Sequence, residues 1–241
     1  MVKNIYNNLI ESLNSLRNPH KAEILSRFFK TGKGEYGEGD VFYGITVPLI
    51  RKQVKDFSHL LTFDDITHLL SSEVHEIRLC GALVLVSKYK NASTENEKTK
   101  IFNFYMGNIQ AINNWDLVDL TCPIIIGNYL FKYQNSDYTL LKKLAKSNNL
   151  WERRISVLST FEFIRNQQPE IALELCKMLL LDKHDLIHKA VGWMLREIGK
   201  RNFDIEYAFV AKYNREMPRT TLRYAIEKFP EKLRQELLLK K

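Results

Sequence analysis

Hydrophobic positions recur at helical spacing from one end of the chain to the other. Ile5, Leu9 and Leu13 lie four residues apart near the start, and Ile171 and Leu175 repeat that spacing far along the chain. Residues at this spacing share one face of a helix. The alternation of polar and apolar residues that predicts half-buried strands is missing as a pattern. Because only 10 Gly and 6 Pro occur in 241 residues, helices have few interruptions. The sequence therefore predicts an all-α protein.

The helical pattern itself repeats. Five segments can be aligned on a charged fifth residue, namely Arg78, Asp119, Arg154, Lys189 and Arg223, at intervals of 41, 35, 35 and 34 residues. Each segment after the first follows another amphipathic stretch, and these four stretches cover residues 96–110, 138–146, 169–181 and 204–213. Two helices per repeat at such a period indicate an α-solenoid of HEAT-like repeats, in which stacked neighbours bury faces that no pair buries alone. We expect one such domain over residues 1–241.

Small residues follow the charged position in most repeats, as at Gly81, Cys122, Ser156, Gly192 and Ala225. They would let neighbouring helices approach closely. A charge that keeps the same register in every inner helix would then line one surface of the solenoid. Four of the five charges are cations, so we expect a concave basic surface.

The overall charge agrees with a polyanionic partner. The chain has 36 Lys and Arg against 28 Asp and Glu, which gives a net charge of +8. Duplex DNA carries a phosphate charge about every 1.7 Å along its axis, so a row of cations attracts it without reading bases. The predicted DNA-binding residues are Arg78, Arg153, Lys189, Arg196 and Arg223. A single cation more often just solvates a helix face, and only the repeated register favours binding.

Trp115 and Asp119 form the clearest candidate for chemistry. They lie four residues apart, on one face of the predicted helix that starts at Trp115. A flat π surface beside a fixed negative charge suits a planar cation. Trp193 shares a face with Lys189 in the same way, whereas Trp151 near Arg154 is predicted to be a core residue. For Trp115 and Trp193, spacing alone leaves core packing and ligand contact equally open.

Asp119 is the one anion of the register. It could form a salt bridge with Arg154 of the next repeat, which would contribute little stability if exposed. Alternatively, its charge could stabilise a cation within the basic surface. A sugar that loses its base develops oxocarbenium character, and an alkylated purine is already cationic. This second interpretation predicts a site that selects cationic lesions over normal bases.

The remaining features narrow the class of protein. Residues 31–40 hold four of the ten glycines but follow no strand and lack the lysine and Ser/Thr ending of a phosphate-binding loop, so we expect a flexible loop there, without a nucleotide site. Cys80, Cys122 and Cys176 have no metal-ligand spacing, and they predict buried free thiols in a reducing compartment. No apolar run is long enough for a membrane span, and residues 1–5 lack a signal-peptide core. We expect a cytoplasmic protein.

Four motifs carry a resemblance to a known family. They are Trp115-Asp116-Leu117-Val118-Asp119, Trp151-Glu152-Arg153-Arg154, the run from Lys189 to Glu197, and the run from Tyr43 to Pro48 ahead of Arg51 and Lys52. With these motifs in order, the chain resembles the DNA alkylation repair family of the AlkD type, which are HEAT-like-repeat DNA glycosylases. The resemblance extends from about residue 20 to about residue 235.

The resemblance implies a monofunctional DNA N-glycosylase that hydrolyses the bond to positively charged N3- and N7-alkylated purines in double-stranded DNA, with neither metal nor organic cofactor. It implies that Asp119 stabilises the sugar cation and positions water. Trp115 and Trp193 would contact the backbone and deoxyribose of the damaged nucleotide, and Arg154 would hold a neighbouring phosphate. A monomer on one duplex is expected.

One departure from the family concerns the glycine-rich residues 32–39, which lengthen the loop where the family has a DNA-contacting aromatic residue. Phe28 or Phe29 could take that place. The alternative function is a non-catalytic HEAT-repeat protein that binds bent or branched DNA. A protein-binding solenoid ranks last, since it would present an apolar concave surface.

Overall fold

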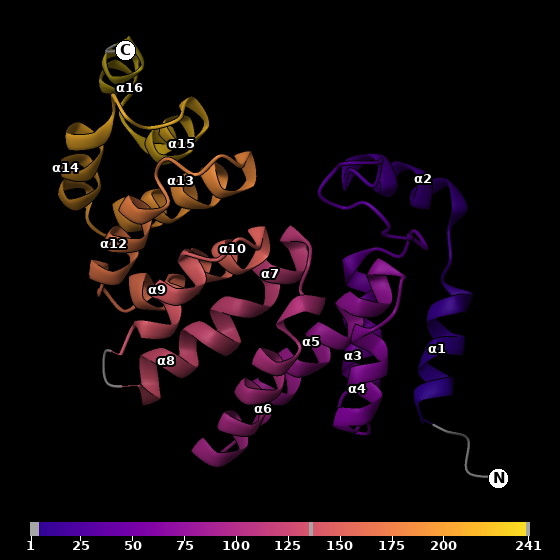
Figure 1. Ribbon diagram of the computed structural model, residues 1–241. Helices are drawn as coiled ribbons and strands as arrows, with labels where there is room; N and C mark the ends of the chain where they lie inside the picture. Colours follow the sequence, from indigo (N-terminus) through magenta and orange to yellow (C-terminus); the bar gives the residue numbers. More distant parts are fainter. Residues whose placement is uncertain (1–4, 135–136, 240–241) are drawn as a thin grey trace. The chain divides into compact units, whose positions relative to one another are not determined.

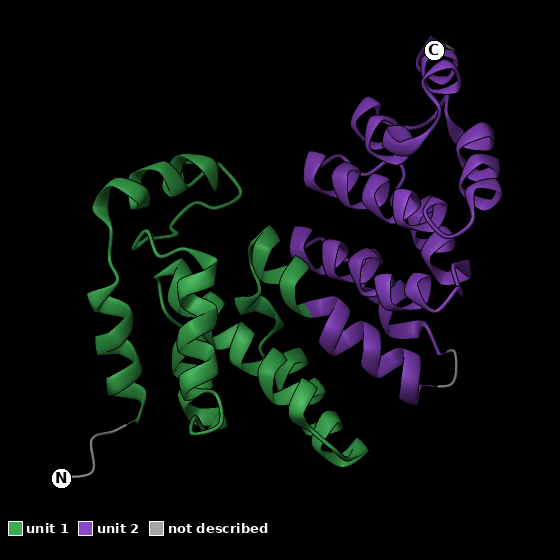
Figure 2. Cartoon of the chain, turned by 180° about the vertical axis from the view of Figure 1, so that it is seen from behind, with its two compact units in different colours: residues 1–121 green, residues 122–241 purple. Residues whose placement is uncertain are grey.

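The computed structural model describes residues 5–134 and 137–239. Within these residues the chain is all-α, and an isolated parallel bridge between Val41 and Val74 is the only β pairing (Figure 1). The chain divides into two compact units, Met1–Thr121 and Cys122–Lys241 (Figure 2). The prediction of one domain over residues 1–241 stays a prediction, since stacked repeats contact only their neighbours and also divide in this way.

The first unit contains α1 (Ile5–Ser15), α2 (Pro19–Phe28), α3 (Val47–Phe57), α4 (Phe63–Leu70), α5 (His75–Asn91), α6 (Glu95–Gly107), the turn η1 (Ile109–Ala111) and α7 (Trp115–Cys122), whose last residue belongs to the second unit. Helix α3 packs against α1 and α5, and α5 also packs against α4 and α6. Helix α5 is buried on all sides, which places it at the centre of this unit.

The second unit contains the π-helical turn η2 (Pro123–Gly127), α8 (Asn128–Tyr133), α9 (Thr139–Ala145), α10 (Leu150–Ser159), α11 (Phe161–Arg165), α12 (Glu170–Met178), α13 (Asp185–Gly199), α14 (Phe203–Tyr213), α15 (Arg219–Ala225), the turn η3 (Ile226–Lys228) and α16 (Glu231–Leu239). Helices α10, α13 and α15 stack in succession, and each of α9, α12 and α14 packs beside one of them. The predicted pairs α9 with α10 and α12 with α13 are therefore confirmed, whereas α14 packs against the preceding α13.

The predicted segment starts agree with the helix starts. Helices α7, α10, α13 and α15 begin at residues 115, 150, 185 and 219, and α5 begins at 75. Glycine permits the close contacts expected after the charged position: a Cβ on Gly81 would lie 2.8 Å from Leu69 Cβ of α4, and one on Gly192 would lie 2.5 Å from Tyr224 Cβ of α15.

The segment between the glycine-rich loop and α3 is held by a buried carboxylate. Glu76, 2% exposed, accepts hydrogen bonds from the backbone N–H groups of Tyr43, Gly44 and Ile45 at 2.7–3.1 Å. Gly44 has φ +79°, and a Cβ there would lie 2.2 Å from the backbone oxygen of Asn18, so only glycine fits. Thr46 directly precedes α3, and its side chain makes no capping hydrogen bond.

Two further expectations concern the cysteines and membrane spans. Cys80, Cys122 and Cys176 are buried and free, as predicted. Among the described residues, no helix has the length and apolar character that crossing a membrane requires.

Candidate active site

Trp115 is the first residue of α7 and Asp119 lies one helical turn further along it; both are half-buried. The residues next to Trp115 anchor this helix. Asn114 is fully buried, and its Oδ1 accepts the backbone N–H of Trp115 at 2.8 Å. Asp116 is 6% exposed, and its Oδ1 accepts the N–H of Leu117 at 2.8 Å. The chain thus presents an indole and a carboxylate from a helix start that buried polar side chains hold in place.

Two phenylalanines at the end of α2 complete the surroundings of Trp115. The Phe29 ring stacks on the Trp115 indole at 4.9 Å between centroids and 7° between planes, and the Phe28 ring meets it edge-on at 5.9 Å. Phe29 is 6% exposed, whereas Phe28 is 63% exposed. Of the two candidates for the family's aromatic position, Phe28 is therefore the one that offers its ring to a ligand.

The glycine-rich loop folds back on these phenylalanines. The N–H of Gly37 donates to the backbone oxygen of Lys30 at 3.1 Å, and a Cβ on Gly37 would lie 2.4 Å from the backbone oxygen of Phe29. The Tyr36 hydroxyl donates to the backbone oxygen of Phe28 at 3.5 Å. The loop was expected to be flexible, yet these contacts tie it to the end of α2.

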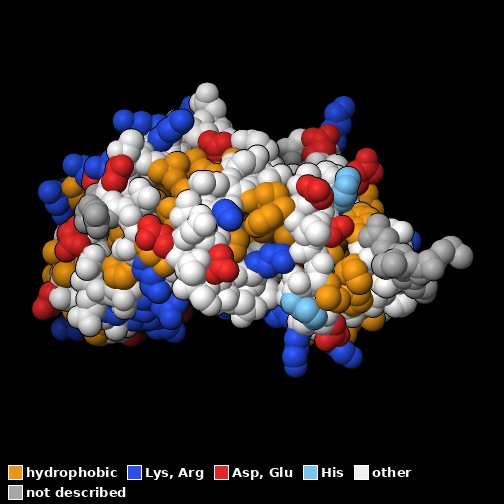
Figure 3. All heavy atoms as spheres, turned by 90° about the horizontal axis from the view of Figure 1, so that it is seen from below, with side chains coloured by type: hydrophobic (Ala, Val, Ile, Leu, Met, Phe, Trp, Pro, Cys, Tyr) orange, Lys and Arg blue, Asp and Glu red, His pale blue; other side chains and the backbone are white. Residues whose placement is uncertain are grey.

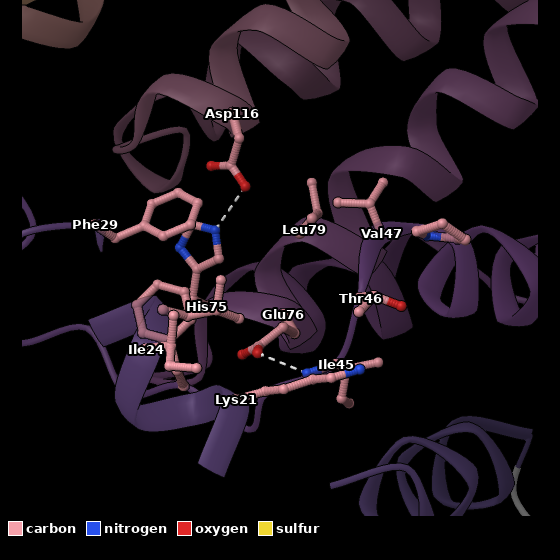
Figure 4. Close-up of a pocket in the computed structure, with 13 residues that line it drawn as sticks. Lys21, Ile24, Phe29, Ile45, Thr46, Val47, His75, Glu76, Leu79 and Asp116 are labelled. Atoms are coloured by element: carbon pink, nitrogen blue, oxygen red, sulfur yellow. Dashed lines mark hydrogen bonds and ion pairs between the residues drawn. The ribbon is translucent and has the colours of Figure 1, made fainter. Parts of the chain in front are cut away.

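A buried polar network connects this loop, α5 and α7. His75 Nε2 lies 2.8 Å from Asp116 Oδ2, and its Nδ1 lies 3.2 Å from Asp40 Oδ2. Asp40 also accepts from Arg78 Nη2 at 2.5 Å and from Asn114 Nδ2 at 3.1 Å. Figure 4 shows the His75 ring directed at the Asp116 carboxylate, with the Phe29 ring beside it. Two carboxylates face two cations, so their charges balance in the interior.

The protonation states follow from these contacts. Burial alone would lower the pKa of His75, but its hydrogen bonds to Asp116 and Asp40 outweigh this effect and raise the pKa to about 9. Burial alone would raise the pKa of Asp40, but His75, Arg78 and Asn114 outweigh it and lower that pKa. At neutral pH both nitrogens of His75 therefore carry protons and donate.

Arg78 is the member of the network that sequence reasoning placed wrongly. We expected it on an exposed basic surface, but it is 5% exposed and paired with Asp40, and its Nη1 donates to the backbone oxygen of Ser72 at 2.8 Å. The reason is that α5 is buried all round, so a charge in this register points into protein. Asp40, 38 residues earlier, supplies the counter-charge.

In the second unit, Trp193 is half-buried on α13. Its Nε1 donates to Glu197 Oε1 at 3.2 Å, and the Phe161 ring lies 6.2 Å away. Glu197 also contacts Lys200 at 2.5 Å and Arg201 at 3.3 Å. Burial alone would raise the pKa of Glu197, but Lys200 and Arg201 outweigh it and lower the pKa. The carboxylate therefore stays ionised and orients the indole.

The predicted cations of this unit differ in their surroundings. Arg154 is 5% exposed, and its Nη1 donates to the backbone oxygen of Leu186 at 2.5 Å. Arg153 pairs with Asp182 at 2.7 Å, and Arg196 pairs with Glu227. Lys189 pairs with Asp185 at 2.8 Å.

Arg223 on α15 is exposed. On the face drawn in Figure 3, Lys and Arg side chains lie among Asp, Glu and hydrophobic side chains. The concave basic surface, like the DNA contacts of these residues, stays a prediction.

Trp151 is 8% exposed, which confirms it as a core residue.

A cavity of about 330 Å³ in the first unit is lined mainly by apolar side chains, among them Phe29 and Phe42, together with His75, Glu76 and Asp116. Among the described residues, no three His, Cys, Asp or Glu side chains are grouped so that they could hold a metal ion.

Four members of the buried network, Asp40, His75, Asn114 and Asp116, were not predicted from the sequence. Asn114 and Asp116 are inside the motif around Trp115, and this nearness was a usable signal. Nothing in the sequence paired them with Asp40 or His75.

The fold and this site define an all-α protein of stacked helices that presents an indole and a carboxylate from one anchored helix start. Residues 9–229 match the family model described as DNA alkylation repair enzyme. The chain belongs to this family, and its role is accordingly in DNA repair, with DNA as substrate.

A solved structure, described as a predicted DNA alkylation repair enzyme from Enterococcus faecalis, is similar with a TM-score of 0.68 and 16% identity over 89% of this chain and 97% of that chain. At 16% identity this similarity shows a shared fold and nothing more. The comparison with curated proteins finds no match.

Proposed function

We propose that the protein is a monofunctional DNA glycosylase that excises positively charged N3- and N7-alkylated purines from duplex DNA. Family membership supports repair of alkylated DNA. The observation that carries the finer proposal is the pair Trp115 and Asp119, one turn apart at an anchored helix start.

The chemistry needs little beyond a well-placed negative charge. An alkylated purine leaves as a neutral base, and the deoxyribose takes up the positive charge as the glycosidic bond breaks. Asp119 stabilises that charge and orients the water that attacks the sugar. Two unit charges at 4 Å attract by about 4 kcal/mol at an effective dielectric of 20. Since about 1.4 kcal/mol corresponds to tenfold in rate, this carboxylate supplies roughly a thousandfold.

That contribution also sets the substrate range. A rate gain of about a thousandfold suffices only where the glycosidic bond is already weak, as it is in a cationic purine. A normal purine has no formal charge to lose and stays bound to its sugar. The site therefore selects lesions through their intrinsic lability.

The aromatic surroundings suit a nucleotide held from outside. Trp115 and the exposed Phe28 offer ring faces and edges to the sugar and backbone. Trp193, oriented by Glu197, would contact the damaged nucleotide's backbone. The motif resemblance assigns a neighbouring phosphate to Arg154, and that side chain, 5% exposed and bonded to the backbone oxygen of Leu186, would have to turn outward to reach it. No metal or organic cofactor enters this proposal, and the protein acts as a monomer.

The test measures release of 7-methylguanine from methylated duplex DNA in single-turnover assays with Asp119→Asn. We expect release to fall about a thousandfold, as the charge estimate gives, while duplex binding stays largely intact. Asp56→Asn, which removes an exposed carboxylate from α3, is the matched control and should behave as wild type. Normal release by Asp119→Asn would refute the mechanism. Tight duplex binding without release by the wild type would instead identify a non-catalytic protein that binds bent or branched DNA.

A further inference from the structure

His75 lies where polar side chains of the glycine-rich loop, α5 and α7 meet. It is 1% exposed, and its ring stacks on Phe42 at 4.6 Å between centroids and lies 4.8 Å from Phe29. Its two nitrogens face two carboxylates from different segments, Asp40 and Asp116. A histidine in this setting is fixed in both position and orientation.

We propose that His75 is a positioning residue, whose doubly protonated ring holds Asp116 and thereby sets the orientation in which α7 presents Trp115 and Asp119. The proposal rests on the glycosylase function proposed above and deepens it. His75 touches no substrate, and its effect passes through the helix start.

The connection between His75 and the candidate site is short. Asp116 follows Trp115 directly and precedes Asp119 by three residues. Asn114, on the other side of Trp115, donates to Asp40, the second partner of the same ring. The two residues that flank Trp115 are thus both joined to His75. Asp116 contacts the ring directly, and Asn114 is joined to it through Asp40. Helix α7 continues directly into η2 and α8, so these side-chain contacts act on its first turn.

The groups around the ring keep it charged. Asp40 and Asp116 both accept from it, while Arg78 neutralises Asp40 from the far side. Glu76, the next residue of α5, is committed to backbone N–H groups of residues 43–45, and Lys21 of α2 lines the same cavity. These contacts hold the pKa of His75 near 9, so the ring keeps its second proton at neutral pH.

Loss of the hydrogen bond between His75 and Asp116, from either side, should displace the first turn of α7. We expect His75→Gln and Asp116→Asn to slow release of 7-methylguanine on the order of 100-fold, which is the cost of a misplacement near 1 Å. Duplex affinity should stay unchanged, because neither residue contacts DNA. The wild-type release rate should also fall as pH rises through about 9, and this step should be missing in His75→Gln. His59→Gln, an exposed histidine of the same unit, is the control.

Two measurements do not depend on base release. Hydrogen exchange of residues 113–122 should speed up in both variants, and the ¹⁵N resonances of the His75 ring should show two N–H groups at pH 7 in the wild type. If the wild type releases no base, the glycosylase proposal fails while these measurements still test His75. If His75→Gln does not fold, Asp116→Asn carries the test, because it leaves the contact with Asp40 in place. The proposal would be overturned if the folded variants showed the same hydrogen exchange and the same rate of 7-methylguanine release as the wild type.

Discussion

The indole of Trp115 and the ring of Phe29 are stacked 7° from parallel, with 4.9 Å between their centroids. Phe29 is buried at the end of α2, so the indole rests on a rigid surface and not on solvent. Phe28, the preceding residue, touches the same indole edge-on and is exposed. Two adjacent phenylalanines therefore have different tasks: Phe29 supports the candidate site, and Phe28 extends it.

These different roles predict that one alanine substitution lowers stability and the other weakens DNA binding. Phe29→Ala removes a buried ring and should lower the free energy of unfolding by about 3 kcal/mol. Phe28→Ala should change stability by less than about 0.5 kcal/mol, because the ring is exposed, yet it should weaken binding to methylated duplex. Urea denaturation and duplex titration of both variants measure these effects. Equal stability losses would contradict the assignment.

The helices and their starts could be predicted because periodic apolar spacing is a local signal. The five aligned segments begin where α5, α7, α10, α13 and α15 begin, to within one residue. Gly81 and Gly192 were likewise predictable as points of close contact, since glycine after a repeated charged position has an evident steric reason. Trp115 and Asp119 were found because four-residue spacing defines a helix face.

The supporting network could not be predicted, because its pairs are distant in sequence. Asp40 lies in the glycine-rich loop and pairs with His75 and Arg78 of α5, 35 and 38 residues later. A fifth-position charge indicates register but not whether the face at that register is exposed. At Arg78 the face is buried, and at Arg223 it is exposed. Only three-dimensional packing distinguishes the two.

Because Arg78 is buried and Arg223 is exposed, we expect different effects from removing each cation. Arg223→Ala should leave the melting temperature unchanged, weaken duplex binding and reduce the salt dependence of log K by about 1, as expected for one lost phosphate contact. Arg78→Ala should instead destabilise the fold by about 3 kcal/mol or more, because it leaves the Asp40 carboxylate buried with one cation fewer. Thermal melting and duplex titration over a range of salt concentrations measure both. An unchanged salt slope for Arg223→Ala would remove that residue from the DNA contacts.

The packing of α13 against α15 gives a further prediction. A Cβ on Gly192 would lie 2.6 Å from the backbone oxygen of Thr221, and a backbone atom cannot move aside as a side chain can. Gly192→Ala should therefore lower the free energy of unfolding by about 2 kcal/mol. Gly107→Ala is the control: no atom lies within 4 Å of a Cβ at that helix end, so stability should hold or rise slightly. Equal results for both would contradict close packing here.

Glu206 on α14 is a buried acid with an unusual environment. It is 2% exposed, and its Oε1 has no hydrogen-bond partner among the residues that the structure describes. Burial raises the pKa of Glu206 to about 8, although the nearby Arg196 acts to lower it. Its carboxyl also fills the space beside Gly199, where a Cβ would collide with Oε2. At neutral pH the folded protein therefore keeps a proton on Glu206 that the unfolded chain has released.

This extra proton makes stability depend on pH in a known direction. Between the unfolded pKa of 4.5 and the folded pKa of about 8, the folded state binds more protons, so stability falls as pH rises. Glu206→Gln cannot ionise, and relative to wild type it should gain up to about 5 kcal/mol across this window. Urea denaturation at pH 5, 6.5 and 8 measures the difference, with Glu216→Gln at an exposed position as control. A constant difference between Glu206→Gln and wild type would mean that Glu206 is already ionised in the folded protein.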